Sequence, residues 1–324
     1  MENVLATVSL DSLQSLDFAD LQEEAREFAR RSKGVGTVRL YDREWRRFVA
    51  WCSAKNQKPL PADPNVVTLY VTDLARTLSV ASINVAVAAI SQAHQVAGID
   101  SPTHTSTFRN VWRGIRRTLG VAAKTQKTPT TTDVVKSMIE VMPEGLIGVR
   151  DHTILLFAFA TAMRRSEIVD TDVSSVRFVE RGLEVTVAKS KTDQEGVGHV
   201  IAVPFGNSER TCPVRALRRW LQASEITEGP LFRSVDRHGR LSDSRLDSGS
   251  VGRIVKRLAE RTGRDPKQFG GHSTRAGFIT SAATNGASER SIAEISNHRS
   301  VQVLRSYVRA ATRFDDNAGA KLGL

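Results

Sequence analysis

Apolar side chains recur at helical spacing through the first third of the chain, and this pattern constrains the fold more than any other feature. The apolar positions step by three and four residues, with no alternating strand pattern between them. Breakers such as the PLPADP run and Gly98 divide the pattern into five helices. They are expected at Asp17–Arg31, Thr37–Asn56, Asn65–Leu78, Ser82–Ala97 and Thr103–Leu119. The sequence therefore predicts a small helical domain over residues 17–121.

A polar stretch separates this domain from the rest of the chain. Residues 122–132 contain Pro129 and lack periodicity, so they are predicted to be a linker, and residues 1–16 are predicted to be a flexible N-terminus. In residues 133–324 two strands, Leu183–Ala188 and His199–Val203, are expected to form a hairpin among helices. These helices are expected at Asp133–Glu140, Arg150–Ala162, Pro213–Ala223, Gly249–Arg261, Thr274–Asn285, Glu289–Ile295 and Val301–Arg313. The predicted fold is mainly α, with one small antiparallel sheet in the second domain.

The charge of the chain indicates a polyanionic partner. The 324 residues carry a formal net charge of +11. Residues 1–130 hold 17 basic and 12 acidic side chains and the remainder holds 29 and 23, so both domains contribute. Two cysteines exclude a disulfide framework and a cysteine-based zinc site. The longest apolar run, Ile154–Ala160, is too short to cross a membrane, and no signal peptide pattern is present, so a cytoplasmic protein without a membrane partner is expected.

Three of the predicted helices carry a basic face opposite an apolar face. These basic residues are Arg39, Arg43, Arg46 and Arg47, then Arg109, Arg113, Arg116 and Arg117, and finally Arg253, Lys256 and Arg257. Two interpretations stay open, because such a face is either solvated or in contact with the phosphates of a nucleic acid. Three such faces in a basic chain favour DNA contacts, which we expect at Arg39, Arg43, Arg109, Arg113 and Arg253.

Four segments of the second domain carry reactive side chains. They are TAMRRSE at 161–167, AKSKT in the hairpin turn, GHSTR at 271–275 and SNHRSVQVLRSY at 296–307. Guanidinium groups match the charge that develops on the oxygens of a reacting phosphodiester. A hydroxyl group supplies the nucleophile, and a lysine or a histidine supplies the proton for the leaving oxygen. The set therefore suits phosphoryl transfer without a cofactor, and no metal site is predicted, since no carboxylate or cysteine accompanies the histidines at ligand spacing.

In this order, the four segments resemble those of the tyrosine recombinases (the phage integrase family), and they look closest to its Cre-type members. The resemblance extends over nearly the whole chain, including AWCSAKN at 50–56 and YVRAATRFDDNAGA at 307–320. It implies a helical, SAM-like core-binding domain at 17–121 and a mixed, mostly α catalytic domain with a C-terminal tail at 133–324. It further implies a bacterial or phage-encoded, nucleoid-associated protein.

The resemblance also implies a reaction and partners. The chain would exchange strands between two sites in double-stranded DNA with inverted repeats, through a 3′-phosphotyrosyl intermediate and a Holliday junction. It would act as a homotetramer on DNA and be monomeric or weakly associated when free. Type IB topoisomerase activity and a non-catalytic DNA-binding regulator on the same scaffold are the alternatives. The intact set of reactive residues argues against the regulator, and the Cre-like helical domain argues against the topoisomerase.

Each residue that matches the family motifs acquires a role from the resemblance. Tyr307 is implied as the nucleophile, and His272 assists the transfer of its proton. The implied ligands of the non-bridging phosphate oxygens are Arg164, Arg275 and His298.

Two further residues have implied roles, and four depart from the family pattern, among them Thr274 and Ala276, which replace the usual leucine and histidine around Arg275. Lys191 is implied to protonate the leaving oxygen, with Lys189 as the competing lysine of the turn, and Glu167 is implied as a supporting residue. Ala162 and Asn297 stand where the family more commonly has glycine.

Overall fold

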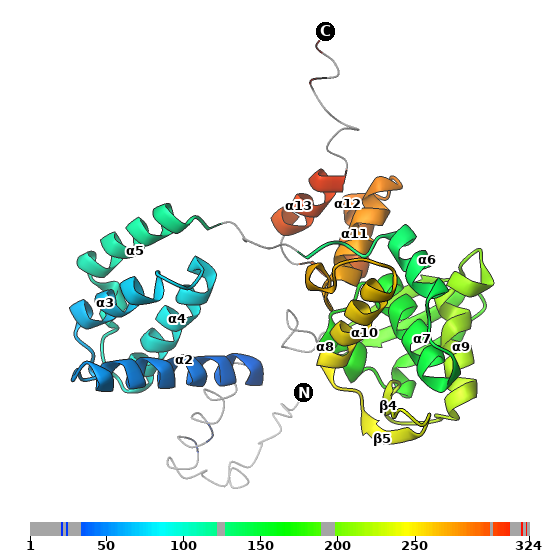
Figure 1. Ribbon diagram of the computed structural model, residues 1–324, viewed down its shortest axis with the longest axis horizontal. Helices are drawn as coiled ribbons and strands as arrows, with labels where there is room; N and C mark the ends of the chain where they lie inside the picture. Colours follow the sequence, from blue (N-terminus) through cyan, green and yellow to red (C-terminus); the bar gives the residue numbers. More distant parts are fainter. Residues whose placement is uncertain are drawn as a thin grey trace, which may run out of the picture. The chain divides into compact units, whose positions relative to one another are not determined.

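The computed structural model describes residues 21, 24, 34–121, 127–188, 198–298, 301–311, 319 and 322. The chain forms two compact units, Met1–Lys124 and Thr125–Leu324 (Figure 1). The boundary between the units falls inside the stretch that the sequence predicts as a linker. The predicted flexible N-terminus and the predicted helix Asp17–Arg31 lie outside the described residues, apart from Leu21 and Glu24.

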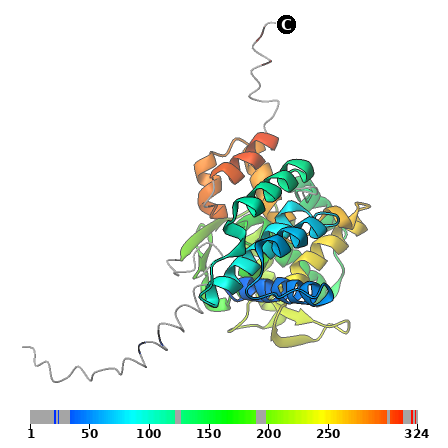
Figure 2. The same cartoon turned by 90° about the vertical axis from the view of Figure 1, so that its left-hand side faces the viewer.

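In the part that the structure describes, the first unit consists of helices alone. They are α2 (Val35–Ala54), α3 (Pro64–Leu74), α4 (Val80–Val96), the short 3-10 helix η2 (Pro102–His104) and α5 (Ser106–Leu119). Figure 2 shows these helices, coloured blue to green, nearest the viewer. Helix α2 packs against α4 and α3 against α5, and the core between them contains Phe48, Tyr70, Ile83, Ile90 and Phe108. Each such side chain contributes about 1.5–3 kcal/mol by leaving water.

Capping side chains set where these helices begin. Asp63 accepts a hydrogen bond from the backbone of Asn65 before α3, and Pro64 occupies the first helical position, where its missing N–H is not needed. The sequence predicts the last helix from Thr103, but Pro102 opens a 3-10 turn there. Helix α5 therefore begins only at Ser106, after the extended capping residue Thr105.

The second unit surrounds one buried helix. Helix α7 (Gly145–Thr161) contacts α6 (Thr132–Glu140), α8 (Arg165–Asp170), α9 (Pro213–Ser224), α10 (Ser248–Arg261) and α11 (Ser273–Thr284). Its side chains from Arg150 to Ala158 are all buried. A smaller cluster joins α11 to α12 (Glu289–Ser296) and α13 (Val301–Ala311) through Ile279, Ile292 and Leu304. The predicted mainly α architecture is confirmed.

The sheet content exceeds the single predicted hairpin. Strands β2 (Gly182–Val187) and β3 (His199–Pro204) pair as expected, with Val187 opposite His199, but β1 (Val176–Val179) adds a third antiparallel strand. A separate hairpin joins β4 (Arg233–Val235) to β5 (Leu241–Arg245). The additional strands are three to five residues long, which is too short to display a clear alternating pattern.

The start of the second unit runs as a strap (residues 127–132) along α11 and the 3-10 turn η5 (Pro266–Gln268). The backbone N–H of Thr128 donates to the carbonyl of Gln268, and that of Thr130 donates to the carbonyl of Ser273, both at 2.8 Å. Gly277 of α11 leaves no room for a side chain, because a Cβ there would lie 1.9 Å from the carbonyl oxygen of Thr130. The strap therefore fixes the first turns of α11.

Candidate active site

The first predicted arginine is held at a sharp turn between α7 and α8. Helix α7 ends because Ala162 adopts the left-handed conformation, with φ 50° and ψ 19°. This conformation costs an L-residue about 1–2 kcal/mol, which is why glycine suits the position. Glu167 accepts hydrogen bonds from the backbone N–H of Arg164 at 2.8 Å and from its Nη1 at 2.6 Å. The buried carboxylate of Glu167 thus orients the Arg164 guanidinium.

Arg275 lies in the first turn of α11 and is only 2% exposed. Its Nη1 donates to the carbonyl oxygen of Ala162 at 2.7 Å, which ties α11 to the end of α7. Burial, followed by the positive charge of Arg164, lowers the pKa of Arg275 to about 10. The Arg275 guanidinium is therefore charged at neutral pH, and Arg164 lies close enough to interact with it. Such a pair of cations is suited to binding an anion such as a phosphate.

His298 lies beside Arg275, beyond the end of α12. That helix ends at Asn297, whose left-handed conformation, with φ 46°, asparagine tolerates better than most residues. Nη2 of Arg275 is 3.1 Å from Nδ1 and 3.3 Å from Nε2 of His298. Burial and the charges of Arg275 and Arg164 lower the pKa of His298 to about 4. The imidazole is therefore neutral at pH 7.

His272 and Tyr307 meet across α11 and α13. Nε2 of His272, the residue that precedes α11, is 3.1 Å from the hydroxyl oxygen of Tyr307. Tyr307 packs against the cluster that joins α11 to α13, with Leu304 buried one turn before it. Burial, and then the charges of Arg275 and Arg164, lower the pKa of His272. A neutral imidazole in hydrogen-bond contact with a hydroxyl can accept its proton.

The structure thus brings five of the six predicted catalytic residues into one cluster. Lys191 and its competitor Lys189 lie outside the described residues. The strand that follows their turn begins at His199, and Nδ2 of Asn297 donates to Nδ1 of this histidine at 3.3 Å. This bond ties the base of the hairpin to the loop that carries His298. Nothing in the local sequence distinguishes His199 from the other histidines, because its partner Asn297 is 98 residues away.

The arginines expected to contact DNA fall into two groups. Arg39, Arg109 and Arg113 are exposed and form no ion pair with another described residue. Arg43 already donates to the buried carboxylate of Glu44 at 2.6 Å, and Arg253 donates to Asp247 at 3.0 Å.

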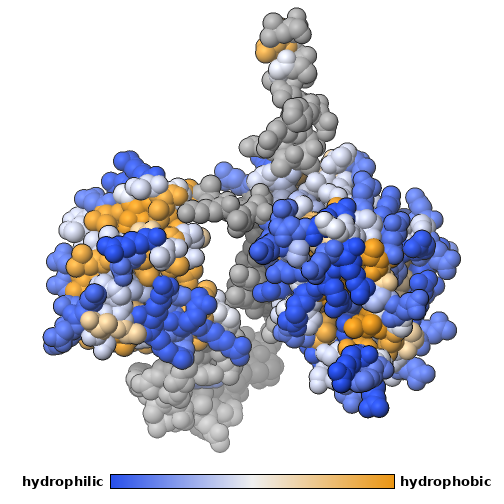
Figure 3. All heavy atoms as spheres, viewed as in Figure 1, coloured by the Kyte–Doolittle hydropathy of each residue, from blue (hydrophilic) through white to orange (hydrophobic). Residues whose placement is uncertain are grey.

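Arg257, which the sequence places on the same basic face as Arg253, turns inward. It pairs with Asp151 of α7, a carboxylate with no exposed surface that also binds Arg150. Its charge therefore joins α10 to α7. Figure 3 shows hydrophilic residues covering the visible face of α10.

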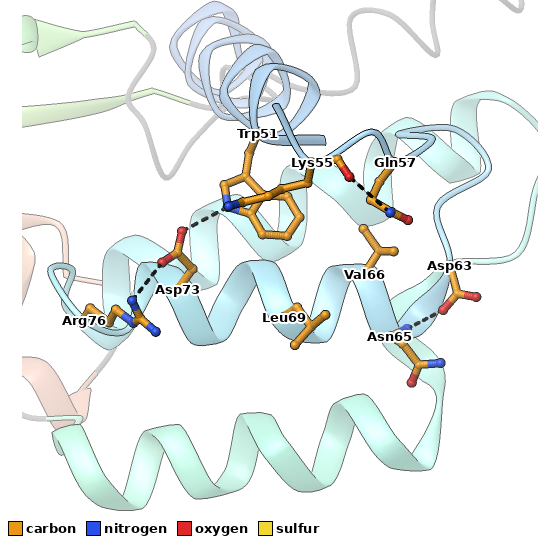
Figure 4. Close-up of a pocket in the computed structure, with 9 residues that line it drawn as sticks. All are labelled: Trp51, Lys55, Gln57, Asp63, Asn65, Val66, Leu69, Asp73 and Arg76. Atoms are coloured by element: carbon orange, nitrogen blue, oxygen red, sulfur yellow. Dashed lines mark hydrogen bonds and ion pairs between the residues drawn. The ribbon is translucent and has the colours of Figure 1, made fainter. Parts of the chain in front are cut away.

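A separate pocket of about 560 Å³ lies in the first unit, between the end of α2 and helix α3 (Figure 4). Trp51 forms one wall and donates its indole N–H to Asp73 at 2.9 Å, and Leu69 is 62% exposed at its mouth. Figure 3 shows apolar surface in this region, over α3 and α5. None of the predicted catalytic residues lines this pocket.

The described residues contain no group of three or more histidine, cysteine, aspartate or glutamate side chains that could hold a metal ion. None of the helices that the structure describes combines the length and the apolar character that a membrane crossing requires.

Solved structures share the fold. The Tn1549 transposon integrase, in complex with transposon right end DNA, matches with a TM-score of 0.61 over 94% of this chain and 99% of that chain, at 14% identity. A lambda integrase dimer bound to a COC′ core site matches with a TM-score of 0.58 over 89% of this chain and 75% of that chain, at 16% identity. At these identities the match concerns the fold alone.

Sequence comparison identifies the family. An integrase/recombinase xerD homolog of Selenomonas ruminantium is 33% identical over 302 residues, which span 92% of this chain and 88% of that protein. The recombinase cre of Escherichia phage P1 is 25% identical over 86% of this chain and 84% of that protein. The model of the phage integrase family matches residues 129–313, which include every predicted catalytic residue. The predicted resemblance is confirmed, and the chain belongs to the phage integrase family.

Proposed function

We propose that this chain is a site-specific DNA recombinase that cleaves and rejoins strands through a 3′-phosphotyrosyl intermediate. One observation carries the proposal: the Tyr307 hydroxyl is 3.1 Å from Nε2 of His272, in a cluster with two guanidinium groups. The relatives named above are integrases and recombinases, which supports this reaction over topoisomerase activity or simple DNA binding. Double-stranded DNA as the partner is supported by the DNA in the two matching solved structures.

In the cleavage step, the Tyr307 oxygen attacks the scissile phosphorus. Its proton passes to the neutral His272, a phosphorus–oxygen bond to tyrosine forms, and the bond to the 5′ oxygen breaks. Arg164 and Arg275 hold the non-bridging oxygens, whose negative charge increases in the transition state. His298 donates a third hydrogen bond to these oxygens.

The leaving 5′ oxygen takes a proton from Lys191. Because the phosphotyrosyl bond keeps the energy of the phosphodiester, the 5′-hydroxyl of a second strand can attack it and reverse the step without ATP. Repeating the exchange on the second pair of strands passes through a Holliday junction. Four copies of the chain on two inverted-repeat sites supply one tyrosine for each strand.

Domain roles follow from the same proposal. Residues 17–121 act as the core-binding domain and residues 133–324 as the catalytic domain, joined by the linker 122–132. The exposed Arg39, Arg109 and Arg113 contact DNA phosphates directly. Arg43 and Arg253 reach the phosphates by exchanging their present carboxylate partners.

The test begins by finding the target. A Tyr307→Phe chain selects binding sites from a pool of random duplexes, and a nicked duplex built on the selected site then traps the covalent intermediate. The wild-type chain and Tyr70→Phe should form an SDS-stable adduct, and Tyr307→Phe should bind without forming one. Tyr70→Phe is the matched control, because it removes a buried hydroxyl that has no hydrogen-bond partner among the described residues. An adduct with Tyr307→Phe would exclude Tyr307 as the nucleophile, and binding without any wild-type adduct would favour a regulator.

A further inference from the structure

Ser296, the last residue of α12, has no exposed surface and lies against His298. Its hydroxyl donates to the carbonyl oxygen of Ile292 at 2.6 Å, and the same oxygen is 2.7 Å from Nδ1 of His298. Nδ1 is thus enclosed by Ser296 on one side and Arg275 on the other. Nε2 contacts Nη2 of Arg275 at 3.3 Å, and it is the ring nitrogen that can meet a substrate once this contact is exchanged.

The available protons permit two arrangements of this group. A hydroxyl has one proton to donate, a neutral imidazole has one, and a guanidinium only donates. In the first arrangement, Ser296 donates to Ile292, Nδ1–H of His298 donates to Ser296, and Nη2 of Arg275 donates to Nε2. In the second, Ser296 donates to Nδ1, and Nε2 carries the ring proton. The carbonyl of Ile292 keeps its helical hydrogen bond in both, so no buried polar atom loses its last partner.

We propose that Ser296 is a positioning residue that selects which ring nitrogen of His298 carries the proton and directs Nε2–H to a non-bridging phosphate oxygen. This inference rests on the proposed function. Without DNA, the first arrangement holds. When a phosphate enters, its oxygen requires a donor, so the ring loses the proton on Nδ1 to water and gains one on Nε2. The Ser296 hydroxyl then rotates to Nδ1, and the number of protons does not change.

The charged surroundings favour such a neutral, one-proton ring. Arg275 and Arg164 both face His298, and together with burial and His272 they lower its pKa. An imidazolium would donate from both nitrogens and would need no selection. At neutral pH the ring has a single proton, so its placement determines whether His298 can donate to the phosphate.

The first test reads the ring proton directly, without DNA. The full chain is labelled with ¹⁵N-histidine, and the ring-nitrogen resonances of His298 are assigned by their loss in His298→Ala. The wild-type chain should carry the proton on Nδ1, and Ser296→Ala should carry it on Nε2, because Nδ1–H would lose its acceptor. Ser291→Ala, which removes a hydroxyl from the first turn of the same helix, should match the wild type. An unchanged proton position in Ser296→Ala overturns the proposal.

The second test uses the DNA site selected with Tyr307→Phe. In a single turnover, Ser296→Ala should form the covalent adduct about fivefold more slowly, because its ring carries the proton on Nε2 but lacks the hydrogen bond to Nδ1, of about 1 kcal/mol, that holds Nε2–H toward the phosphate. In a chain that already carries His298→Ala, Ser296→Ala should slow adduct formation no further, because Ser296 acts through the imidazole ring that this chain lacks. Equal slowing in both backgrounds overturns the proposal. If no variant or wild-type chain forms an adduct, the proposed function fails, while the proton position still decides the role of Ser296.

Discussion

Replacing Glu167 by glutamine should disable Arg164 while leaving its guanidinium present. The carboxylate accepts two hydrogen bonds from Arg164, at 2.8 and 2.6 Å, whereas a glutamine side chain accepts through one oxygen only. Losing a capping bond costs about 1 kcal/mol, and weakening a charge-assisted bond costs about 1.5–3 kcal/mol. We therefore expect the free energy of unfolding of the second unit to fall by about 2.5–4 kcal/mol. A guanidinium displaced by about 1 Å should slow cleavage about 100-fold.

The assay compares Glu167→Gln with Glu184→Gln. Glu184 pairs with Arg177 between β1 and β2, so the control removes the same charge from the same kind of pair. That pair is exposed, and its loss should change the free energy of unfolding by less than about 1 kcal/mol and leave cleavage unchanged. Unfolding is followed by denaturant titration and cleavage by single-turnover adduct formation. Cleavage by folded Glu167→Gln within twofold of the wild type would refute the argument that Glu167 positions a catalytic arginine.

Three further results are expected. Lys191→Ala should be nearly inactive on normal DNA but should regain adduct formation on a 5′-bridging phosphorothiolate, because the leaving thiolate needs no proton. If Lys189→Ala recovers in this way and Lys191→Ala does not, Lys189 is the residue that protonates the leaving oxygen. Since burial and nearby arginines lower the pKa of His272 below 6.5, adduct formation should fall as acid protonates the ring and reach half its maximal rate below pH 6.5. A midpoint above pH 6.5 would contradict its role as base. Arg39→Gln should reduce the slope of log affinity against log salt concentration by about 0.9. Arg43→Gln should reduce this slope by less, because Arg43 already has a carboxylate partner. Equal slopes for the wild type and Arg39→Gln would show that this basic face is solvated and does not contact DNA.

Local patterns predicted most of the helices, because most have an apolar face that is visible over a few residues, but they missed α8 and placed the start of α7 at Arg150 instead of Gly145. The bounds expected for Pro213–Ala223, Gly249–Arg261 and Glu289–Ile295 differ from those of the structure by one residue at one end. The missed elements are short or irregular. Strand β1 spans four residues, and the turn at Pro102 replaces a helical start. Pairing with β2 determines the conformation of β1, and the Ser101 cap with Pro102 determines that of the turn, so periodicity reports neither.

The candidate site was predictable as a set of residue types in order, but its connections were not. The contact between His272 and Tyr307 joins residues 35 apart, and that between Arg275 and Ala162 joins residues 113 apart. No rule based on the spacing of residues predicts a contact between residues so far apart in the sequence. The role of Ser296 also has no signal in the sequence, because a serine at a helix end is ordinary until its neighbour is known. The departures at Ala162 and Asn297 gained a physical meaning only from their left-handed backbones.

The hydrogen bonds of the strap bear on the point during synthesis at which the candidate site can form. Residues 127–132 form their hydrogen bonds with partners about 140 positions further along the chain, so a very long loop must close before α11 is held in place. Such closures occur late in folding, since the chain loses much freedom before the contacts compensate for it. While α11 and α13 are still inside the ribosome, the part of the nascent chain that has emerged contains Arg164 but neither His272 nor Tyr307. In the proposed mechanism, the ability to cleave DNA therefore arises only when the chain has been made as far as α13.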